Sequence, residues 1–405
     1  MPMHDLLWMA VHQLLRCDNI STAPARDALW RGGPRAGVVV SLNPSKRTKS
    51  ELAGQAFGYA RCFLALPSFN SPRWLFPLGN SRSALAGLEI YKPYARTARV
   101  LKSFLKAAVV AHCLPFASNR MLLVSQGPLP LEDLVREVTG ERQTVFSLSI
   151  GTEPRFRKLT VQVMRPEGEI LGYIKLPLTD AAVERVRHEA EILNCLWSFP
   201  ALRPHIPRVL YFGEWGEGDI LFQSGGPPWP GPAQFNDHYQ EFLQLLWGIQ
   251  AAQKPGHVLC EEVAARWRKT EPSLCSAWRA LGQAALAEAR RELEGVMVPC
   301  GVSHGDFAPW NTRIGDQGLF VFDWESASWE SPTLWDAFHF KTQVAVLLKK
   351  RNHVHLSQEP HSGERASFML YLLSSACRLF SEEGPAQSVG LEFRRELLAK
   401  ELGGY

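Results

Sequence analysis

Residues 302–311 read VSHGDFAPWN, and residues 319–325 read LFVFDWE. The first segment places a histidine, a carboxylate and an amide within one short loop, at His304, Asp306 and Asn311. The second is an apolar run that ends in Asp323, a pattern typical of a buried strand that carries a carboxylate at its end. Because carboxylate and amide oxygens suit Mg²⁺, the two segments predict a site for metal-assisted chemistry.

Phosphoryl transfer needs three groups of these types. One carboxylate orients the acceptor hydroxyl, while an amide oxygen and a second carboxylate hold a divalent metal against the nucleotide phosphates. Asp306, Asn311 and Asp323 match these roles in order. A shuffled chain with the same 12 His, 11 Asp and 9 Asn would contain the spacing H-x-D-x4-N roughly 0.007 times, so chance is a poor explanation.

Hydrophobic periodicity predicts the elements that surround this loop. Strands are expected at residues 145–150, 159–164, 170–176, 208–213 and 219–223, and helices at 6–15, 94–111, 181–197, 236–253, 261–267 and 272–294. The first three strands form an antiparallel meander, since a short turn joins the second to the third. The Gly- and Pro-rich residues 224–228 after the last strand predict a joint between two lobes.

Two further charged residues extend the pattern upstream. Lys175 lies near the end of the third strand of the meander, and Glu189 follows fourteen residues later inside the next predicted helix. An ion pair between them would hold the lysine ammonium against nucleotide phosphates. Glu191 lies in the same helix and is the competing partner.

With these residues in place, the sequence HGDFAPWN at 304–311, followed by FDWE at 322–325, resembles the aminoglycoside phosphotransferase and choline kinase-like family. The resemblance covers about residues 140–345. It implies an α+β, bilobal protein-kinase-like fold, with a small antiparallel-sheet lobe and a helical large lobe, preceded by a basic N-terminal α/β region. The expected domains are residues 1–130, 140–224 and 225–405.

The resemblance implies transfer of the γ-phosphate of ATP, with Mg²⁺, to a hydroxyl of a small molecule such as a sugar, an aminoglycoside or an amino alcohol. By this resemblance, Asp306 is the catalytic carboxylate, and Asn311 and Asp323 bind the metal. Lys175 contacts the α- and β-phosphates, and Glu189 holds Lys175. The backbone from Gln223 to Gly225 meets the adenine, His304 shapes the loop and Asp336 is structural. The family's acceptor specificity lies in the large-lobe helices, here roughly residues 235–295 and 335–400.

One segment departs from the family's pattern. Residues 151–158 read GTEPRFRK, with a single glycine where a phosphate-covering loop belongs. Arg155, Arg157 or Lys158 could supply charge to the phosphates instead, although a solvated hairpin is the simpler interpretation. The alternative function is therefore a pseudokinase, a binding or scaffolding protein that uses its basic N-terminal region.

The net charge of +4 is unevenly distributed. Residues 1–130 hold 16 Lys or Arg against 5 Asp or Glu, and the remainder holds 28 against 35. A basic face of this kind suits an anionic ligand or a membrane surface. A nucleic acid is not an expected partner, because no recognisable nucleic-acid-binding signature is present. No apolar run reaches the roughly 18 to 20 residues of a membrane span and no signal peptide is recognisable, so we expect a cytoplasmic protein.

Overall fold

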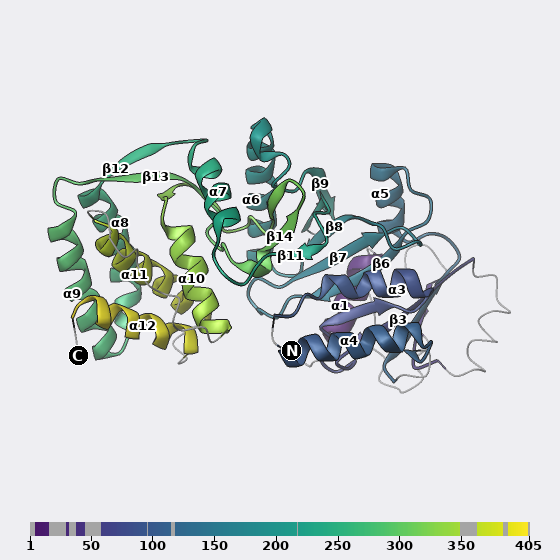
Figure 1. The fold of residues 1–405 in the computed structure, drawn as a ribbon. Helices are drawn as coiled ribbons and strands as arrows, with labels where there is room; N and C mark the ends of the chain where they lie inside the picture. The colour runs from purple at the N-terminus through teal and green to yellow at the C-terminus, as the bar shows by residue number, and fades with distance from the viewer. Residues whose placement is uncertain are drawn as a thin grey trace. The chain divides into compact units, whose positions relative to one another are not determined.

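The computed structural model describes residues 5–15, 30–31, 38–44, 58–94, 96–114, 118–216, 218–348, 363–383 and 388–403. The chain forms two compact units (Figure 1). The first comprises Met1–Asn194 and Pro207–Gly226, and the second comprises Cys195–Ile206 and Pro227–Tyr405. The predicted joint at residues 224–228 coincides with the passage of the chain from the first unit to the second.

The first unit is built on one ten-stranded sheet. Its strands are β1 (Trp30–Arg31), β2 (Val38–Leu42), β3 (Tyr59–Leu66), β4 (Trp74–Pro77), β5 (Arg120–Ser125), β6 (Val145–Ile150), β7 (Lys158–Met164), β8 (Ile170–Pro177), β9 (Val209–Trp215) and β10 (Gly218–Ser224). Their order is β1-β2-β5-β3-β4-β6-β7-β8-β10-β9, and every neighbouring pair is antiparallel. The predicted meander of β6, β7 and β8 is confirmed.

The pairing of β4 with β6 makes this sheet continuous. Leu75 of β4 lies opposite Leu148 of β6, and both side chains are fully buried in one hydrophobic core. The predicted division between residues 1–130 and 140–224 therefore falls inside a single compact unit, whose strands come from both regions. The physical reason is a shared core, because Leu75 of β4 is buried together with the alternate residues Phe146, Leu148 and Ile150 of β6.

Helices pack on this sheet. They are α1 (Asp5–Leu15), α3 (Ser81–Gly87), the short 3₁₀ helix Leu88–Ile90, α4 (Arg96–Val110), α5 (Pro130–Thr139) and α6 (Asp180–Trp197). Leu7, Val11 and Leu14 place one face of α1 in the core that also contains the buried residues of β6, β7 and β8. The indole of Trp215 in β9 donates to the carbonyl of Gln13 at 3.0 Å, which fixes the end of α1.

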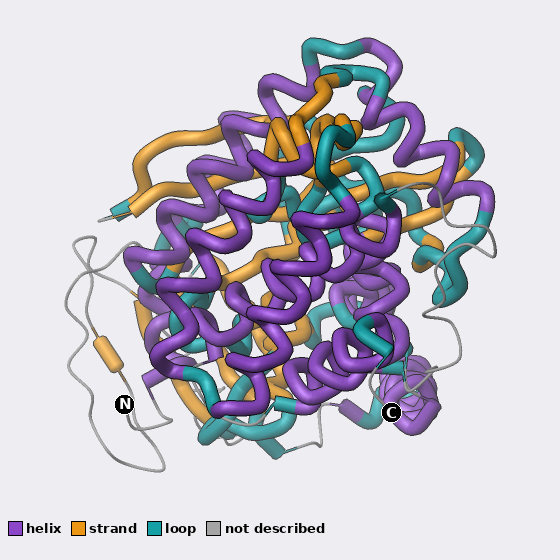
Figure 2. Tube along the Cα trace, turned by 90° about the vertical axis from the view of Figure 1, so that its left-hand side faces the viewer, coloured by secondary structure: helices purple, strands orange, loops and turns teal. Residues whose placement is uncertain are grey.

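The second unit is mostly helical. Figure 2 draws the whole chain with its helices in purple. Its elements are β11 (Trp229–Pro230), α7 (Asp237–Trp247), β12 (Ala252–Pro255), α8 (Gly256–Thr270), α9 (Ser276–Glu292), β13 (Met297–Ser303), β14 (Thr312–Gly315), β15 (Gly318–Val321), β16 (Ser328–Pro332), α10 (Trp335–Leu347), α11 (Glu364–Glu383) and α12 (Val389–Glu401). Helices α8 to α12 enclose one hydrophobic core. The predicted α+β class, with an antiparallel-sheet lobe followed by a helical lobe, is confirmed.

The predicted helix at 236–253 is wrong in its last six residues. Helix α7 ends at Trp247, and Ala252–Pro255 forms β12 instead, pairing antiparallel with β13. Gly248 caps the helix, and Pro255 cannot donate a hydrogen bond within a continuing helix. The backbone groups of this segment are therefore satisfied by a strand partner some 45 residues away in sequence, a contact that helical periodicity does not report.

Part of the predicted basic face of the N-terminal region is neutralised locally. Lys92, Lys102 and Lys106 all form ion pairs with Glu89, at 3.1, 3.2 and 2.8 Å. Burial raises the pKa of this carboxyl, but the three ammonium groups outweigh it and bring the pKa to about 2. Through their ion pairs with Glu89, these lysines thus stabilise the junction between α3 and α4, in addition to their place in the basic region. Among the described residues, no helix is long and apolar enough to cross a membrane.

We predict that Leu14→Ala lowers the free energy of unfolding by about 2 to 5 kcal/mol, because a fully buried leucine is replaced by a cavity. Gln13→Ala, at the neighbouring half-buried position, is the control and should change it by about 0.5 kcal/mol or less. Urea unfolding followed by circular dichroism measures both. Equal effects of the two substitutions would contradict the placement of α1 in the core.

Candidate active site

The loop after β13 carries Asp306, and its backbone path depends on glycine. Gly305 has a φ of +76°, and a Cβ there would lie 2.1 Å from the carbonyl oxygen of Ser326. Both its positive φ and the lack of space exclude other residues. The Gly305 carbonyl accepts a hydrogen bond from Arg378 Nη1 at 2.8 Å. The glycine of HGD therefore allows the tight turn that presents Asp306.

Asp336, in the first turn of α10, holds the loop turn at His304 and Gly305 in place. Its two carboxylate oxygens accept the backbone N–H groups of His304 at 2.7 Å and Gly305 at 2.9 Å. The residue is 1% exposed. Burial raises the pKa of its carboxyl, although the backbone N–H groups of His304 and Gly305 oppose the rise. Its carboxylate is thus used inside the fold, in agreement with a structural role.

His304 links the loop to the strand end that carries Asp323. The backbone N–H of Asp306 donates to His304 Nδ1 at 3.3 Å, and Nε2 lies 3.0 Å from the carbonyl oxygen of Phe322. Since Nδ1 accepts, Nε2 carries the proton and donates to Phe322, which defines a neutral tautomer. The fully buried ring therefore ties the backbone before Asp306 to the residue before Asp323.

Both oxygens of the Asp306 carboxylate are held in place. Oδ1 lies 2.9 Å from His339 Nε2, and Oδ2 accepts the amide N–H of Asn311 at 2.9 Å. About a third of the side chain, 34%, remains exposed. Asp306 is therefore a fixed carboxylate that is still accessible, which is the arrangement needed to orient a hydroxyl group.

His339, on α10, was not among the residues predicted from the sequence. Its Nδ1 accepts from the hydroxyl of Tyr371 at 3.2 Å, which leaves the Nε2 proton to donate to Asp306. Its side chain is 3% exposed, and burial lowers its pKa to about 4 even though Asp306 favours the charged form. The sequence offers one feature that could have identified His339. It follows Asp336 by three residues, so the two lie on the same helix face.

The pKa of Asp306 lies below its usual value. Burial alone would raise it, but the hydrogen bond from His339 and the positive charge of Arg378 outweigh burial. The carboxylate is therefore ionised at neutral pH. A carboxylate with a depressed pKa is suited to orient a hydroxyl and take its proton as the transition state forms, rather than to act as an acid.

The two predicted metal ligands come from adjacent strand ends. Strands β14 and β15 pair antiparallel, and the N–H of Phe322 donates to the carbonyl of Asn311 at 3.0 Å. This pairing places Asn311 beside the residue that precedes Asp323. The amide nitrogen of Asn311 donates to Asp306, so its amide oxygen faces another direction and can serve as a ligand.

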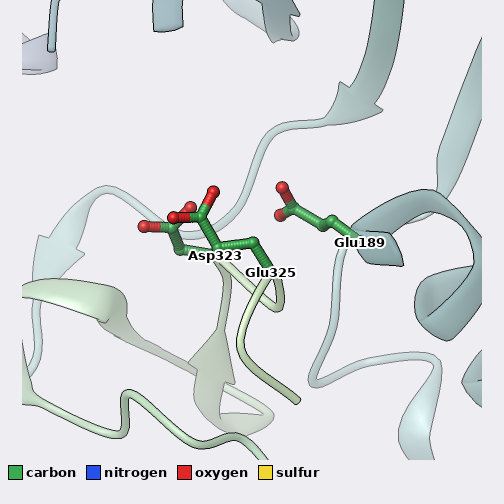
Figure 3. A group of neighbouring side chains, drawn as sticks. All are labelled: Glu189, Asp323 and Glu325. Atoms are coloured by element: carbon green, nitrogen blue, oxygen red, sulfur yellow. The ribbon is translucent and has the colours of Figure 1, made fainter. Parts of the chain in front are cut away.

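Asp323 is followed by a second carboxylate that the sequence analysis did not assign. Asp323 has a φ of +70°, which is uncommon for a residue with a side chain and typical of functional sites. A carboxylate oxygen of Asp323 and one of Glu325 lie within 4.8 Å of each other on the loop after β15 (Figure 3). Asn311, Asp323 and Glu325 all offer oxygen ligands, the type that Mg²⁺ prefers.

Within the first unit, Lys175 of β8 pairs with Glu189 of α6. The lysine Nζ lies 2.6 Å from Oε1 and 2.5 Å from Oε2 of the carboxylate. The residues are 4% and 0% exposed, respectively, whereas the competing Glu191 is exposed. Figure 3 shows Glu189 projecting from α6. Removing one member of such a buried pair leaves an uncompensated charge, so each residue depends on the other.

Gln223 and Gly225 lie at the end of β10, where the first unit ends. Gln223 is 3% exposed, and among the described residues its Oε1 atom has no hydrogen-bond partner. A buried acceptor of this kind costs free energy unless a ligand satisfies it. A nucleobase with an exocyclic amino group is a chemically suitable partner, so this segment fits the predicted adenine contact.

The hairpin at residues 151–158 is closed by its own interactions. The N–H of Gly151 donates to the Lys158 carbonyl at 2.9 Å, and Arg157 Nε donates to the Gly151 carbonyl at 3.1 Å. The guanidinium of Arg155 lies over the ring of Phe156, 5.2 Å from its centroid. Two of the predicted phosphate-binding cations thus have contacts within the hairpin.

Residues 165–336 match the profile of the phosphotransferase enzyme family. The predicted family is confirmed for this segment. It contains the Lys175–Glu189 pair as well as the loop of Asp306 and Asn311 and the carboxylate of Asp323. This family consists of phosphotransferase enzymes, in agreement with the predicted class of small-molecule kinase.

No curated protein matches the chain. Several solved structures are similar to part of it. The choline kinase LicA from Streptococcus pneumoniae matches with 15% identity and a TM-score of 0.46, over 68% of this chain and 99% of that chain. The GDP complex of wild-type aminoglycoside 2'-phosphotransferase-IIIa matches with 14% identity and a TM-score of 0.44, over 67% and 97%. A thermostable mutant of the aminoglycoside phosphotransferase APH(4)-Ia matches with 14% identity and a TM-score of 0.46, over 67% and 98%.

The buried neutral His339 predicts a pH dependence of stability. Its folded pKa of about 4 lies below the usual value of 6.5, so between these values the unfolded chain binds a proton that the folded chain does not. The contribution of His339 to the free energy of unfolding should therefore fall as the pH falls from 6.5 to 4, by about 3 kcal/mol. The lowered pKa of Asp306 acts in a more acidic range.

Urea unfolding at pH 4 to 7 measures the slope of the free energy of unfolding against pH. His339→Gln should flatten it, because the amide does not titrate, whereas His238→Gln, at an exposed position, should leave it unchanged. A slope that His339→Gln leaves intact would assign the pH dependence to other groups.

Proposed function

We propose that the protein is an ATP- and Mg²⁺-dependent phosphotransferase that moves the γ-phosphate of ATP to a hydroxyl of a small molecule. The observation that carries the proposal is the state of Asp306. Its carboxylate is ionised, still accessible, and held by His339 on one oxygen and by Asn311 on the other. A carboxylate fixed in this way beside an amide ligand is what transfer to a hydroxyl requires.

In the proposed reaction, Asp306 orients the acceptor hydroxyl and accepts its proton. A bond forms between the hydroxyl oxygen and the γ-phosphorus as the bond from that phosphorus to the β–γ bridging oxygen breaks. The electron pair of the broken bond leaves with ADP, and the proton passes from Asp306 to solvent. The products are a phosphate monoester, ADP and a proton, so atoms and charge balance.

The lysine of the buried pair has a separate role in the proposal. Lys175 binds the α- and β-phosphates, and Glu189 keeps its ammonium group oriented. The strand end at Gln223 and Gly225 binds the adenine, for which the buried Oε1 of Gln223 provides an acceptor. The buried ion pair supports the first role, and the buried Gln223 Oε1 atom without a partner supports the second.

The metal would be held by Asn311 and Asp323, with Glu325 as a further carboxylate. Bound Mg²⁺ supplies positive charge that offsets the charge of the phosphates during transfer. His304 contributes indirectly, because it ties the backbone at Asp306 to that at Phe322. The acceptor classes implied by the family are sugars, aminoglycosides and amino alcohols, and the cytoplasm is the proposed location.

The competing proposal is a pseudokinase that binds a partner through the basic N-terminal region. The closed hairpin at residues 151–158 favours it, since this hairpin offers a single glycine to a phosphate. The ionised Asp306 and the intact Lys175–Glu189 pair favour the enzyme. Nucleotide binding and turnover decide between the two.

We predict that Asp306→Asn lowers the turnover of ATP and acceptor by about 10²- to 10⁴-fold, because the amide cannot take the hydroxyl proton. The affinity for ATP should stay within a few-fold of the wild type. Asp316→Asn, at an exposed turn position, serves as the control and should retain full turnover. Release of ADP, measured in a coupled assay, reports the rates. Undiminished turnover in Asp306→Asn would exclude this carboxylate as the catalytic group.

We predict that ATP raises the melting temperature of the wild type by a few degrees only when Mg²⁺ is present, because a ligand of the native state stabilises it by RT ln(1 + [L]/Kd). Asp323→Ala should lose the Mg²⁺-dependent part of the rise, and Asp316→Ala should keep it. A thermal-shift titration makes the comparison without an acceptor. No shift in the wild type at millimolar ATP would favour the pseudokinase.

A further inference from the structure

A pocket of about 530 Å³ lies within the second unit, beside the catalytic loop. Its walls come from α8, the end of β13, residues 326–331, α10 and α11. Asp306 itself does not line the pocket, but its neighbour Gly305 and its partner His339 do. The volume falls in the range of roughly 300 to 1,000 Å³ that is common for small-molecule sites.

Three cationic side chains line this pocket. Arg266 and Lys269 come from the last turns of α8, and Arg378 comes from α11. Arg266 donates one hydrogen bond to Ser374 Oγ at 3.2 Å, and Arg378 donates one to the Gly305 carbonyl at 2.8 Å. A guanidinium has five N–H donors, so both retain donors for a ligand. Lys269 is exposed.

Acidic side chains are few in the lining of this pocket. Among the described residues that line the pocket, Asp336 is the single acid. Both of its oxygens accept backbone N–H groups, and it is 1% exposed. A cationic ligand would therefore meet three positive charges and a carboxylate that is already used, whereas an anionic ligand would meet three potential partners.

The remaining lining is rich in hydroxyl groups. Seven of the seventeen lining residues are serines, and Thr270 and Tyr371 add two more hydroxyls. Such groups both donate and accept, which suits a ligand with several hydroxyls of its own. Trp335 supplies an aromatic surface, and its indole N–H is held by Ser367 Oγ at 3.3 Å. The lining thus resembles a site for a small polyol more than one for an apolar compound.

We propose that this pocket binds the acceptor, and that the acceptor is a small polyhydroxylated anion that carries a phosphate or carboxylate group. Arg266, Lys269 and Arg378 hold the anionic group, and a hydroxyl at the other end of the molecule reaches Asp306. The inference rests on the proposed phosphotransferase function and narrows its acceptor class. It disfavours aminoglycosides and amino alcohols, because their cationic groups would be repelled by the same three side chains.

A matched series of ligands tests the charge preference directly. Glucose, glucose 6-phosphate, gluconate and glucosamine share a carbon skeleton and differ in charge. Each is titrated into the full-length protein with a non-hydrolysable ATP analogue and Mg²⁺, and binding is followed by thermal shift and calorimetry. We expect glucose 6-phosphate or gluconate to bind at least tenfold more tightly than glucose, and glucosamine to bind most weakly. The relative affinities of the two anions tell a phosphate site from a carboxylate site.

Variants on α8 connect the preference to the pocket. Arg266→Met/Lys269→Met should reduce the affinity for the preferred anion at least tenfold and leave that for glucose unchanged. Arg268→Met, a neighbouring exposed residue on α8 that does not line the pocket, is the matched control and should bind like the wild type. Unchanged circular dichroism melting of all three proteins shows that folding is intact. In turnover assays, the double variant should raise KM for the anion with little change in kcat.

The outcomes separate this inference from the proposed function. Turnover of neutral or amino compounds in preference to anions would overturn the inference and leave the phosphotransferase in place. The inference would also be overturned by a preference for anions that the double variant does not alter. A failure of both anions to bind at 10 millimolar, roughly the weakest useful affinity, would overturn it as well. Absence of ATP binding would instead overturn the proposed function, and the acceptor role of the pocket with it.

Discussion

The hydrogen bonds from the backbone of His304 and Gly305 to the buried Asp336 carboxylate are the constraint on which the rest of the site depends. They fix a turn that only glycine can form, because a side chain at 305 would meet the Ser326 carbonyl. The same turn directs Asp306 toward His339 and Asn311. One carboxylate, excluded from water, thus uses both of its oxygens to position another that remains accessible.

Much of this arrangement could be predicted from the sequence, because local spacing determined it. The offset from Asp306 to Asn311 keeps both in one loop, and the apolar run before Asp323 identifies the strand that delivers it. The Lys175–Glu189 pair followed from a strand and the next helix, although only the structure distinguishes Glu189, which is buried, from the exposed Glu191.

The features that could not be predicted depend on contacts between segments that are far apart in the sequence. His339 contacts Asp306, and Tyr371 contacts His339, only once α10 and α11 have packed. The strand Ala252–Pro255 exists because β13 is available to pair with it. The cations of the pocket, Arg266 and Lys269 on one helix and Arg378 on another, are more than a hundred residues apart in the chain. No periodicity or local motif encodes such neighbours.

The join between β4 and β6 has a consequence for how the first unit can associate with other molecules. A β6 strand without this neighbour would expose a row of unpaired N–H and carbonyl groups, a ready template for another chain. Here β4 occupies that edge, so among the described strands the free edges belong to the two-residue β1 and to β9. Edge-to-edge assembly at β6 is thereby excluded, and the N-terminal strands act as a built-in protection against aggregation for the sheet that carries Lys175.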